Sequence, residues 1–74
     1  MLFATYLKKK IEDMELLQYK VDQEVGIGKS PFSKLLRDRR SIKEREKVAL
    51  CRVLNVPEEL VELRDDNKYY YIGA

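Results

Sequence analysis

Hydrophobic residues recur along the chain at the three- and four-residue spacings that place side chains on one face of a helix. A first helix is predicted over residues 2–14, where the stripe consists of Phe3, Leu7, Ile11 and Met14. Val21 and Val25 predict a second helix over residues 18–25, and a third has an inward face of Phe32, Leu35 and Leu36. A fourth helix has a core side made of Val48, Ala49, Leu50, Cys51 and Leu54. The pattern therefore predicts a mainly helical domain.

The break between the second and third helices is short and contains two of the chain's three glycines. Gly26 stands where the second helix must stop, because glycine adopts the left-handed conformation at no steric cost. Ser30 is the predicted N-cap of the third helix, and Pro31 is its predicted first residue, where the missing N–H is not needed. Residues 18–37 thus predict two short helices joined by a tight turn.

The start of the fourth helix carries a polar signal. Ser41 and Glu44 have the spacing of a capping box, in which each side chain bonds a backbone N–H of the other. The run of residues 44–47, in which acidic and basic side chains alternate, is predicted to be a solvated and internally paired face. Asn55 is expected to end this helix, because asparagine tolerates the left-handed conformation.

The end of the chain is predicted to hold a fifth helix and a short tail. Pro57 would begin the helix, whose apolar residues are Leu60, Val61 and Leu63. A polar break over residues 64–67 precedes a stretch of high β propensity, consisting of Tyr69, Tyr70, Tyr71 and Ile72. This tail has three open interpretations: it folds back over the core, it pairs as a strand with a second chain, or it is exposed and disordered.

Composition and charge narrow the classes of protein that fit. Seventy-four residues make one small domain with a modest core, which association with another subunit would help to stabilise. The formal net charge is only +2, but its distribution is uneven. Residues 29–47 contain eight Lys/Arg and three Asp/Glu, whereas residues 55–74 contain two and five. Positive charge is therefore concentrated around the third helix, as expected of a surface that meets phosphates.

The residues that carry most enzyme and metal chemistry are sparse. A single cysteine and no histidine leave no disulfide framework within the chain and argue against a zinc site. Cys51 lies among apolar residues and is predicted to be a buried hydrophobic side chain. We expect no enzymatic activity, no cofactor and no small-molecule substrate, because so small a chain shapes no convincing pocket for acid–base chemistry. Gly28-Lys29-Ser30 lacks the glycine five residues earlier that a nucleotide-binding Walker loop requires.

Neither a membrane span nor a secretion signal is evident. No apolar run approaches the roughly 20 residues that a membrane-spanning helix needs, and the N-terminus does not have the pattern of a signal peptide. The run of lysines at residues 8–10 is predicted to be a solvated helix face, with a phosphate contact as the alternative. A reducing cytoplasm is the expected location.

Residues 18–37 resemble the helix-turn-helix of Xre/Cro-type transcription regulators. That family has typical residues at six positions of the motif, matched here by Gln18, Val21, Gly26, Ile27, Phe32 and Leu35. Asp22 stands where the family has alanine or another small residue, so it must find a cation or hold the two helices apart. The likeness covers about residues 5–64. It implies an all-α, five-helix, lambda-repressor-like domain over residues 1–66, followed by a tail of residues 67–74 that is extended or β.

The resemblance also implies a site for double-stranded DNA. The third helix would enter the major groove and present Lys29, Ser30, Pro31, Ser33 and Lys34 to base edges, with Arg37 on the same outer face. Arg39, Arg40 and Lys43 would contact the sugar-phosphate backbone. Gln18 would bond a phosphate, or it is an ordinary surface residue. The alternative for the whole basic face is that it merely keeps the domain soluble.

The expected function is that of a repressor of phage Cro-like size, acting as a homodimer that covers an operator and blocks polymerase. One alternative is the DNA-binding antitoxin of a toxin–antitoxin pair, which a co-purifying toxin would reveal. A second is a protein-interaction module that reuses this fold, which would be favoured if the protein has no affinity for duplex DNA at low salt. Dimerisation through the tyrosine-rich tail is a further hypothesis.

Overall fold

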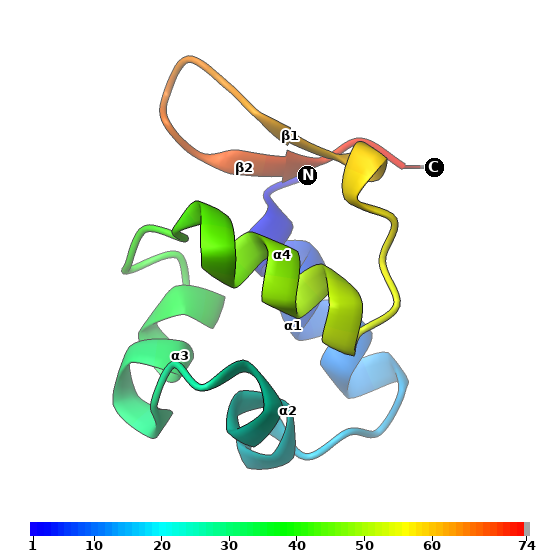
Figure 1. Ribbon diagram of the computed structural model, residues 1–74, viewed down its shortest axis with the longest axis vertical. Coiled ribbons are helices and arrows are strands. Elements are labelled where there is room, and N and C mark those ends of the chain that lie inside the picture. The colour runs from blue at the N-terminus through cyan, green and yellow to red at the C-terminus, as the bar shows by residue number, and fades with distance from the viewer. Residues whose placement is uncertain (74) are drawn as a thin grey trace.

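The computed structural model describes residues 1–73, and its elements are four α-helices followed by a small β-hairpin (Figure 1). The helices are α1 (Phe3–Asp13), α2 (Gln18–Val25), α3 (Lys29–Leu36) and α4 (Glu44–Val53). A 3-10 turn (Glu58–Leu60) leads into the antiparallel strands β1 (Val61–Leu63) and β2 (Tyr69–Tyr71). The prediction of a mainly helical domain is confirmed. The predicted five-helix architecture is wrong.

The core lies where α1, α3 and α4 meet. Its fully buried side chains include Phe3, Leu7, Phe32, Leu35, Leu50 and Leu54. Burying one such side chain contributes roughly 1.5–3 kcal/mol, so this small set supplies much of the folding free energy. Cys51 is buried among them, as predicted. Val48 and Ala49 are only half-buried, because α4 turns them away from the centre of the core.

Met14 does not continue the buried stripe of α1. Its side chain is 52% exposed, because α1 ends at Asp13 and the chain then reverses. Glu15 adopts a left-handed conformation with a φ of 55°, and the Leu16 N–H donates to the Ile11 carbonyl at 2.9 Å. This is a Schellman closure built without glycine. The same closure ends α3 at Asp38 and α4 at Asn55.

The predicted fifth helix is replaced by a single 3-10 turn and β1. Val61, Glu62 and Leu63 pair with Tyr71, Tyr70 and Tyr69 respectively. A helix of about seven residues is marginal in water by itself, because its nucleation is costly. Pairing with β2 satisfies the backbone polar groups of β1 in another way and brings Val61, Tyr69 and Tyr71 against the core.

The tyrosine-rich stretch folds back onto the domain, which is the first of the three interpretations left open by the sequence. β2 lies between β1 and the N-terminus, where Leu2 forms a bridge with Tyr70. The Tyr71 N–H donates to the Met1 carbonyl at 2.8 Å, and the Tyr71 ring stacks on Tyr6 with 3.7 Å between centroids. Both edges of β2 are therefore occupied within one chain. Within residues 1–73, no helix combines the length and apolar character that crossing a bilayer requires.

Candidate nucleic-acid interface

Helices α2 and α3 are joined by the three residues 26–28 and pack with their apolar sides inward. Gly26 is left-handed, with a φ of 81°, as predicted from its place at the end of α2. Gly28 has a φ of 113°, a conformation strained for any residue with a side chain, and a Cβ there would lie 3.2 Å from Pro31 Cγ. The two glycines therefore allow the chain to reverse within one short turn.

The predicted capping of α3 is wrong in detail. Gly28 is the N-cap, α3 begins at Lys29, and the first helical hydrogen bond joins the Phe32 N–H to the Gly28 carbonyl at 2.9 Å. Ser30 is therefore inside the helix, and Pro31 is its third residue. Proline is tolerated there because N–H groups of the first turn have no partner within the helix.

Asp22 fixes the turn that precedes α3, although no side chain caps the helix itself. Its Oδ1 accepts hydrogen bonds from the N–H of Ile27 at 3.1 Å and of Gly28 at 2.9 Å. The cation that the sequence led us to expect is absent, since no ion pair within residues 1–73 involves Asp22. The half-buried carboxylate is instead satisfied by backbone amides of the turn, in hydrogen bonds that its charge strengthens.

The outward side of α3 carries the residues predicted to face DNA. Lys29, Ser30, Lys34 and Arg37 are exposed, and Pro31 and Ser33 are half-buried. Arg39 and Lys43 are exposed on the segment that follows. Within residues 1–73, no ion pair involves Lys29, Lys34, Arg37, Arg39 or Lys43. These cations are accordingly free to meet an external anion.

The first turns of α2 and α3 come together at the surface. Gln18, Tyr19, Asp22, Lys29 and Phe32 line a notch of about 230 Å³. Gln18 therefore lies beside the start of α3, as its predicted role requires. Tyr19 also lines this notch and is 54% exposed, and no role was predicted for it from the sequence. The signal that could have found it is its place next to Gln18 at the start of α2.

Arg40 is not a free cation, because its guanidinium is paired with Glu46, and the phosphate contact expected of it stays a prediction. Its guanidinium forms two hydrogen bonds of 2.8 Å with the two carboxylate oxygens of Glu46, and it also donates to the Ser41 carbonyl at 3.1 Å. Glu46 is only 7% exposed, so the prediction of a solvated side chain there is wrong. The pair fixes the segment between α3 and α4, and Arg40 acts there as a structural residue.

Glu46 also starts α4. Its carboxylate accepts a hydrogen bond from the Lys43 N–H at 3.0 Å, so Lys43 is the N-cap and the predicted box of Ser41 and Glu44 is wrong. Hydrogen bonds from Arg40, and more weakly from the Lys43 amide, hold the pKa of Glu46 below its usual range, although burial opposes this. Glu46 thus remains ionised and joins the helix start to Arg40.

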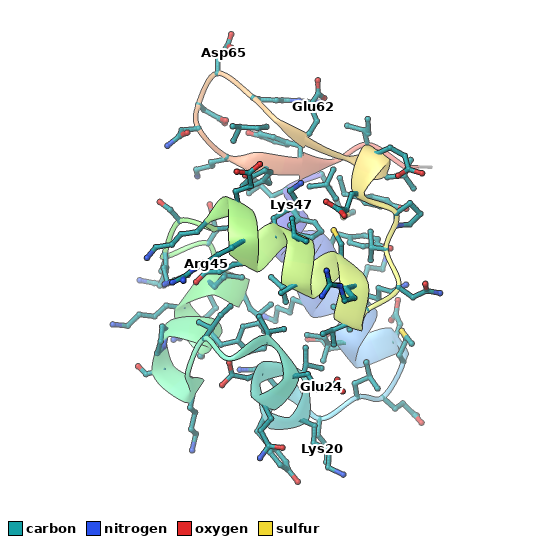
Figure 2. All side chains as sticks on the ribbon, viewed as in Figure 1. Lys20, Glu24, Arg45, Lys47, Glu62 and Asp65 are labelled. Atoms are coloured by element: carbon teal, nitrogen blue, oxygen red, sulfur yellow. The ribbon has the colours of Figure 1, made fainter. Side chains whose placement is uncertain are left out.

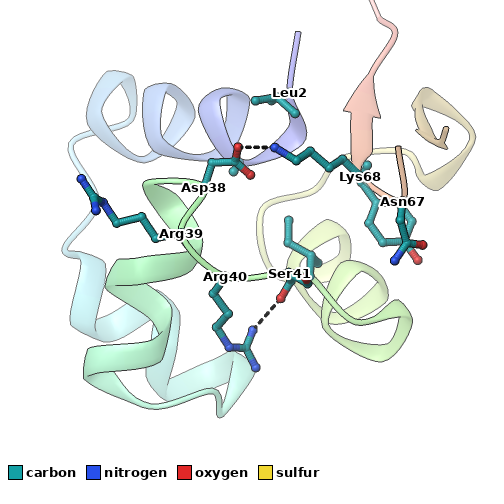
Figure 3. A pocket seen from close by; sticks show the side chains of 10 residues that line it. Leu2, Asp38, Arg39, Arg40, Ser41, Asn67 and Lys68 are labelled. Atoms are coloured by element: carbon teal, nitrogen blue, oxygen red, sulfur yellow. Dashed lines mark hydrogen bonds and ion pairs between the residues drawn. The ribbon is translucent and has the colours of Figure 1, made fainter. Parts of the chain in front are cut away.

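The hairpin is tied to the same segment from the other side. Lys68, in the turn before β2, forms an ion pair with Asp38 at 2.8 Å, and the two residues border a pocket of about 200 Å³ (Figure 3). Figure 3 also shows Arg39 extending away from Lys68. Residues 37–43 are therefore linked to α4 through Glu46 and to the hairpin through Lys68. The Arg39 side chain remains available to an external anion.

Other chemistry is limited in the part of the chain that the structure describes. Residues 1–73 contain no group of three or more His, Cys, Asp or Glu placed to hold a metal ion. Burial raises the pKa of the Cys51 thiol, which is the opposite of what a nucleophilic cysteine needs. No family model, curated protein or solved structure matches the chain. The features of the described residues that bear on function are therefore α2, α3 and the charge around them.

Proposed function

We propose that this protein is a sequence-specific regulator that binds double-stranded DNA through α3, with a lambda-repressor-like arrangement of α1 to α4. The observation that carries the proposal is the α2–α3 pair. It buries Val21, Phe32 and Leu35 on one side and presents unpaired cations on the other. A surface that only kept the domain soluble would not need its unpaired cations gathered along α3 and the segment after it, with Lys29 beside Gln18.

In this proposal, α3 lies in the major groove with its first turn toward the bases. Lys29 and Lys34 donate to guanine O6 and N7, Ser30 and Ser33 bond bases or phosphates, and Pro31 meets a thymine methyl. None of these is a bidentate pair of the Arg–guanine kind. Specificity is therefore modest per contact and shared with the shape of the duplex.

Phosphate contacts flank this groove. Gln18 donates to the backbone from the start of α2, and Arg37, Arg39 and Lys43 do so from the end of α3 and the start of α4. Each phosphate neutralised by a cation contributes a slope of about −0.9 to the dependence of log affinity on log salt. Two copies form a homodimer in the cytoplasm and read half-sites roughly 34 Å apart, and the bound dimer blocks polymerase.

The experiment that tests this function is selection from a randomised duplex pool at about 150 mM salt, where weak electrostatic binding is reduced. Enrichment of an inverted repeat is expected. Enrichment of a single half-site would retain sequence reading but remove the homodimer. Absence of any enriched sequence would overturn the proposal.

A second candidate function is protein binding, and one observation favours it. Met14, Leu16 and Leu17 are exposed and line a groove of about 540 Å³ between the α1–α2 connection and α4. Glu24 also lines the groove, and the exposed Glu15 lies between Met14 and Leu16 in the chain. Lys20 lines the groove as well, so an amphipathic helix with an apolar stripe would complement this surface. Failure of the wild-type protein to bind any duplex at about 50 mM salt would favour this function.

A further inference from the structure

Asp22 places a negative charge inside the surface that is proposed to meet DNA. It lines the notch at the start of α3 together with Gln18 and Lys29, and it is half-buried. Both recorded hydrogen bonds of its side chain end on Oδ1. No cation within residues 1–73 forms an ion pair with its carboxylate. The charge is therefore uncompensated by any side chain at ion-pair distance.

The position of Asp22 combines two physical effects that can be separated. The first is turn geometry, because Oδ1 satisfies the N–H groups of Ile27 and Gly28 and thereby fixes the turn from which α3 starts. The second is charge, because a carboxylate at this end of α3 complements the helix dipole but repels DNA phosphates. Fixing the turn needs only an acceptor oxygen, which the amide of asparagine also provides.

The carboxylate also occupies the amides that an external anion would otherwise use. Backbone N–H groups ahead of a helix are a common phosphate-binding element. Here two of them already donate to Asp22, so phosphate cannot gain those bonds without displacing it. The interface must then draw its affinity from side chains such as Lys29 and Lys34.

We propose that Asp22 is the positioning residue of this DNA interface: its oxygen fixes the start of α3, and its charge limits affinity for every duplex. Discrimination between sequences then depends on the orientation of α3 in the groove. The affinity for DNA is lower than the cations would give without the charge of Asp22. This inference rests on the proposed DNA-binding function.

Two substitutions separate the effects. Asp22→Asn keeps an acceptor for the turn and removes the charge, so affinity rises by about two- to fivefold for preferred and random duplexes alike. The ratio of the two affinities stays unchanged. Asp22→Ala also removes the acceptor that fixes the turn, so the ratio falls by about tenfold, because a misplaced α3 loses base contacts more than phosphate contacts.

Glu24→Gln is the matched control. Glu24 is on the same helix and is exposed, but it lines the groove beside Leu17 instead of the notch beside Lys29. The substitution changes the net charge by the same amount as Asp22→Asn. Glu24→Gln should raise DNA affinity clearly less than Asp22→Asn does, because the charge of Glu24 lies away from the notch at the start of α3.

The measurement is fluorescence anisotropy with the duplex enriched from the randomised pool and with a random duplex of equal length, over a series of salt concentrations. Tighter binding by Asp22→Asn than by Glu24→Gln, with an unchanged affinity ratio, supports the inference. Equal affinities for wild type, Asp22→Asn and Glu24→Gln overturn it, as does a reduced ratio in Asp22→Asn. No binding by the wild-type protein would instead overturn the proposed function itself.

Discussion

The α2–α3 pair and the β-hairpin use their charged residues in opposite ways. Around α3, the exposed cations have no ion-pair partner within residues 1–73, whereas on the hairpin side Arg64 pairs with Glu62 and Lys68 with Asp38. Figure 2 shows Glu62 and Asp65 at the end of the molecule opposite to Lys20 of α2. Charges that are paired within the fold already have partners, whereas charges left unpaired are available to a ligand.

The two regions also differ in how their contacts are distributed along the chain. The turn between α2 and α3 is fixed by Asp22 and amides five and six residues away. The hairpin is fixed by contacts between residues as distant as Met1 and Tyr71, and Lys68 reaches back to Asp38. We infer that the first region carries the DNA-binding function and that the second mainly stabilises it.

The largest expected effect on stability comes from Glu46 of α4, which belongs to neither of the two regions. Glu46→Ala should reduce the free energy of unfolding by about 3 kcal/mol, because it leaves the Arg40 guanidinium without its ion-pair partner and removes the acceptor for the Lys43 amide. Urea unfolding measures this loss. The control is Glu44→Ala, an exposed residue two positions earlier that forms no ion pair within residues 1–73. A similar loss in both variants would contradict the role given to Arg40 and Glu46.

A second substitution tests whether the hairpin is structural. Tyr69→Ala should cost about 2 kcal/mol of stability, because Tyr69 packs against the core and lies beneath Lys47. Tyr70 pairs with Glu62 and is not among the residues packed on the core, so Tyr70→Ala should cost much less. DNA affinity of the folded Tyr69→Ala protein should equal that of wild type. A selective loss of DNA affinity would place the hairpin in the interface.

The third prediction divides base contacts from phosphate contacts. Lys34→Ala should weaken binding to the preferred duplex by roughly 10- to 100-fold and binding to random DNA much less, since Lys34 is assigned to a base edge. Arg39→Ala should weaken both alike and reduce the salt slope by about one. Anisotropy titrations of both variants on both duplexes give the comparison. Equal losses for both variants on both duplexes would argue against reading by α3.

Acid should destabilise the region around Arg40. The pKa of Glu46 is depressed in the folded protein, chiefly by Arg40, so the folded state holds this proton less tightly than the unfolded state does. The resulting stability is fully present above the ordinary pKa of glutamate, about 4.3, and is lost as pH falls through the lower folded pKa. Glu46→Gln should flatten the acid side of the stability profile measured by urea unfolding from about pH 6 to about pH 3, a range that spans the ordinary pKa of glutamate. If the profile of Glu46→Gln matched that of wild type, the acid sensitivity would come from other residues.

The smallest effect concerns the left-handed residue after α1. Glu15→Gly should stabilise the fold by about 0.5 kcal/mol, because the relief of left-handed strain exceeds the added entropy of the unfolded chain. Thermal unfolding would detect a rise in Tm of a few degrees. Lys20→Gly, inside α2, is the opposite control and should destabilise the protein.

The features predicted best from the sequence are those determined by residues close together in the chain. Helices α1 to α4 follow from their apolar spacing, and Gly26 ends α2 because the position needs a left-handed residue. The fifth helix was wrong because β1 is decided by Tyr69 to Tyr71 and by the N-terminus, which are remote in sequence. Spacing alone does not reveal such pairing.

The candidate site was predicted in outline but not in its internal bonds. The outward positions of Lys29, Ser30 and Lys34 follow from the inward stripe of α3. The roles of Asp22 and Arg40 did not, because a charged side chain that bonds within the fold has the same sequence signal as one that faces solvent. Only the three-dimensional structure distinguishes a carboxylate that bonds turn amides, or a pair of charges bonded to each other, from residues free to bind a ligand.

The most direct test of the division between the two regions is amide chemical-shift mapping of the labelled full-length chain with the duplex enriched by selection. The account predicts perturbations that centre on α3 and extend over residues 18–43, with the amides of β1 and β2 unchanged. Perturbations centred on the hairpin, with α3 unaffected, would contradict it.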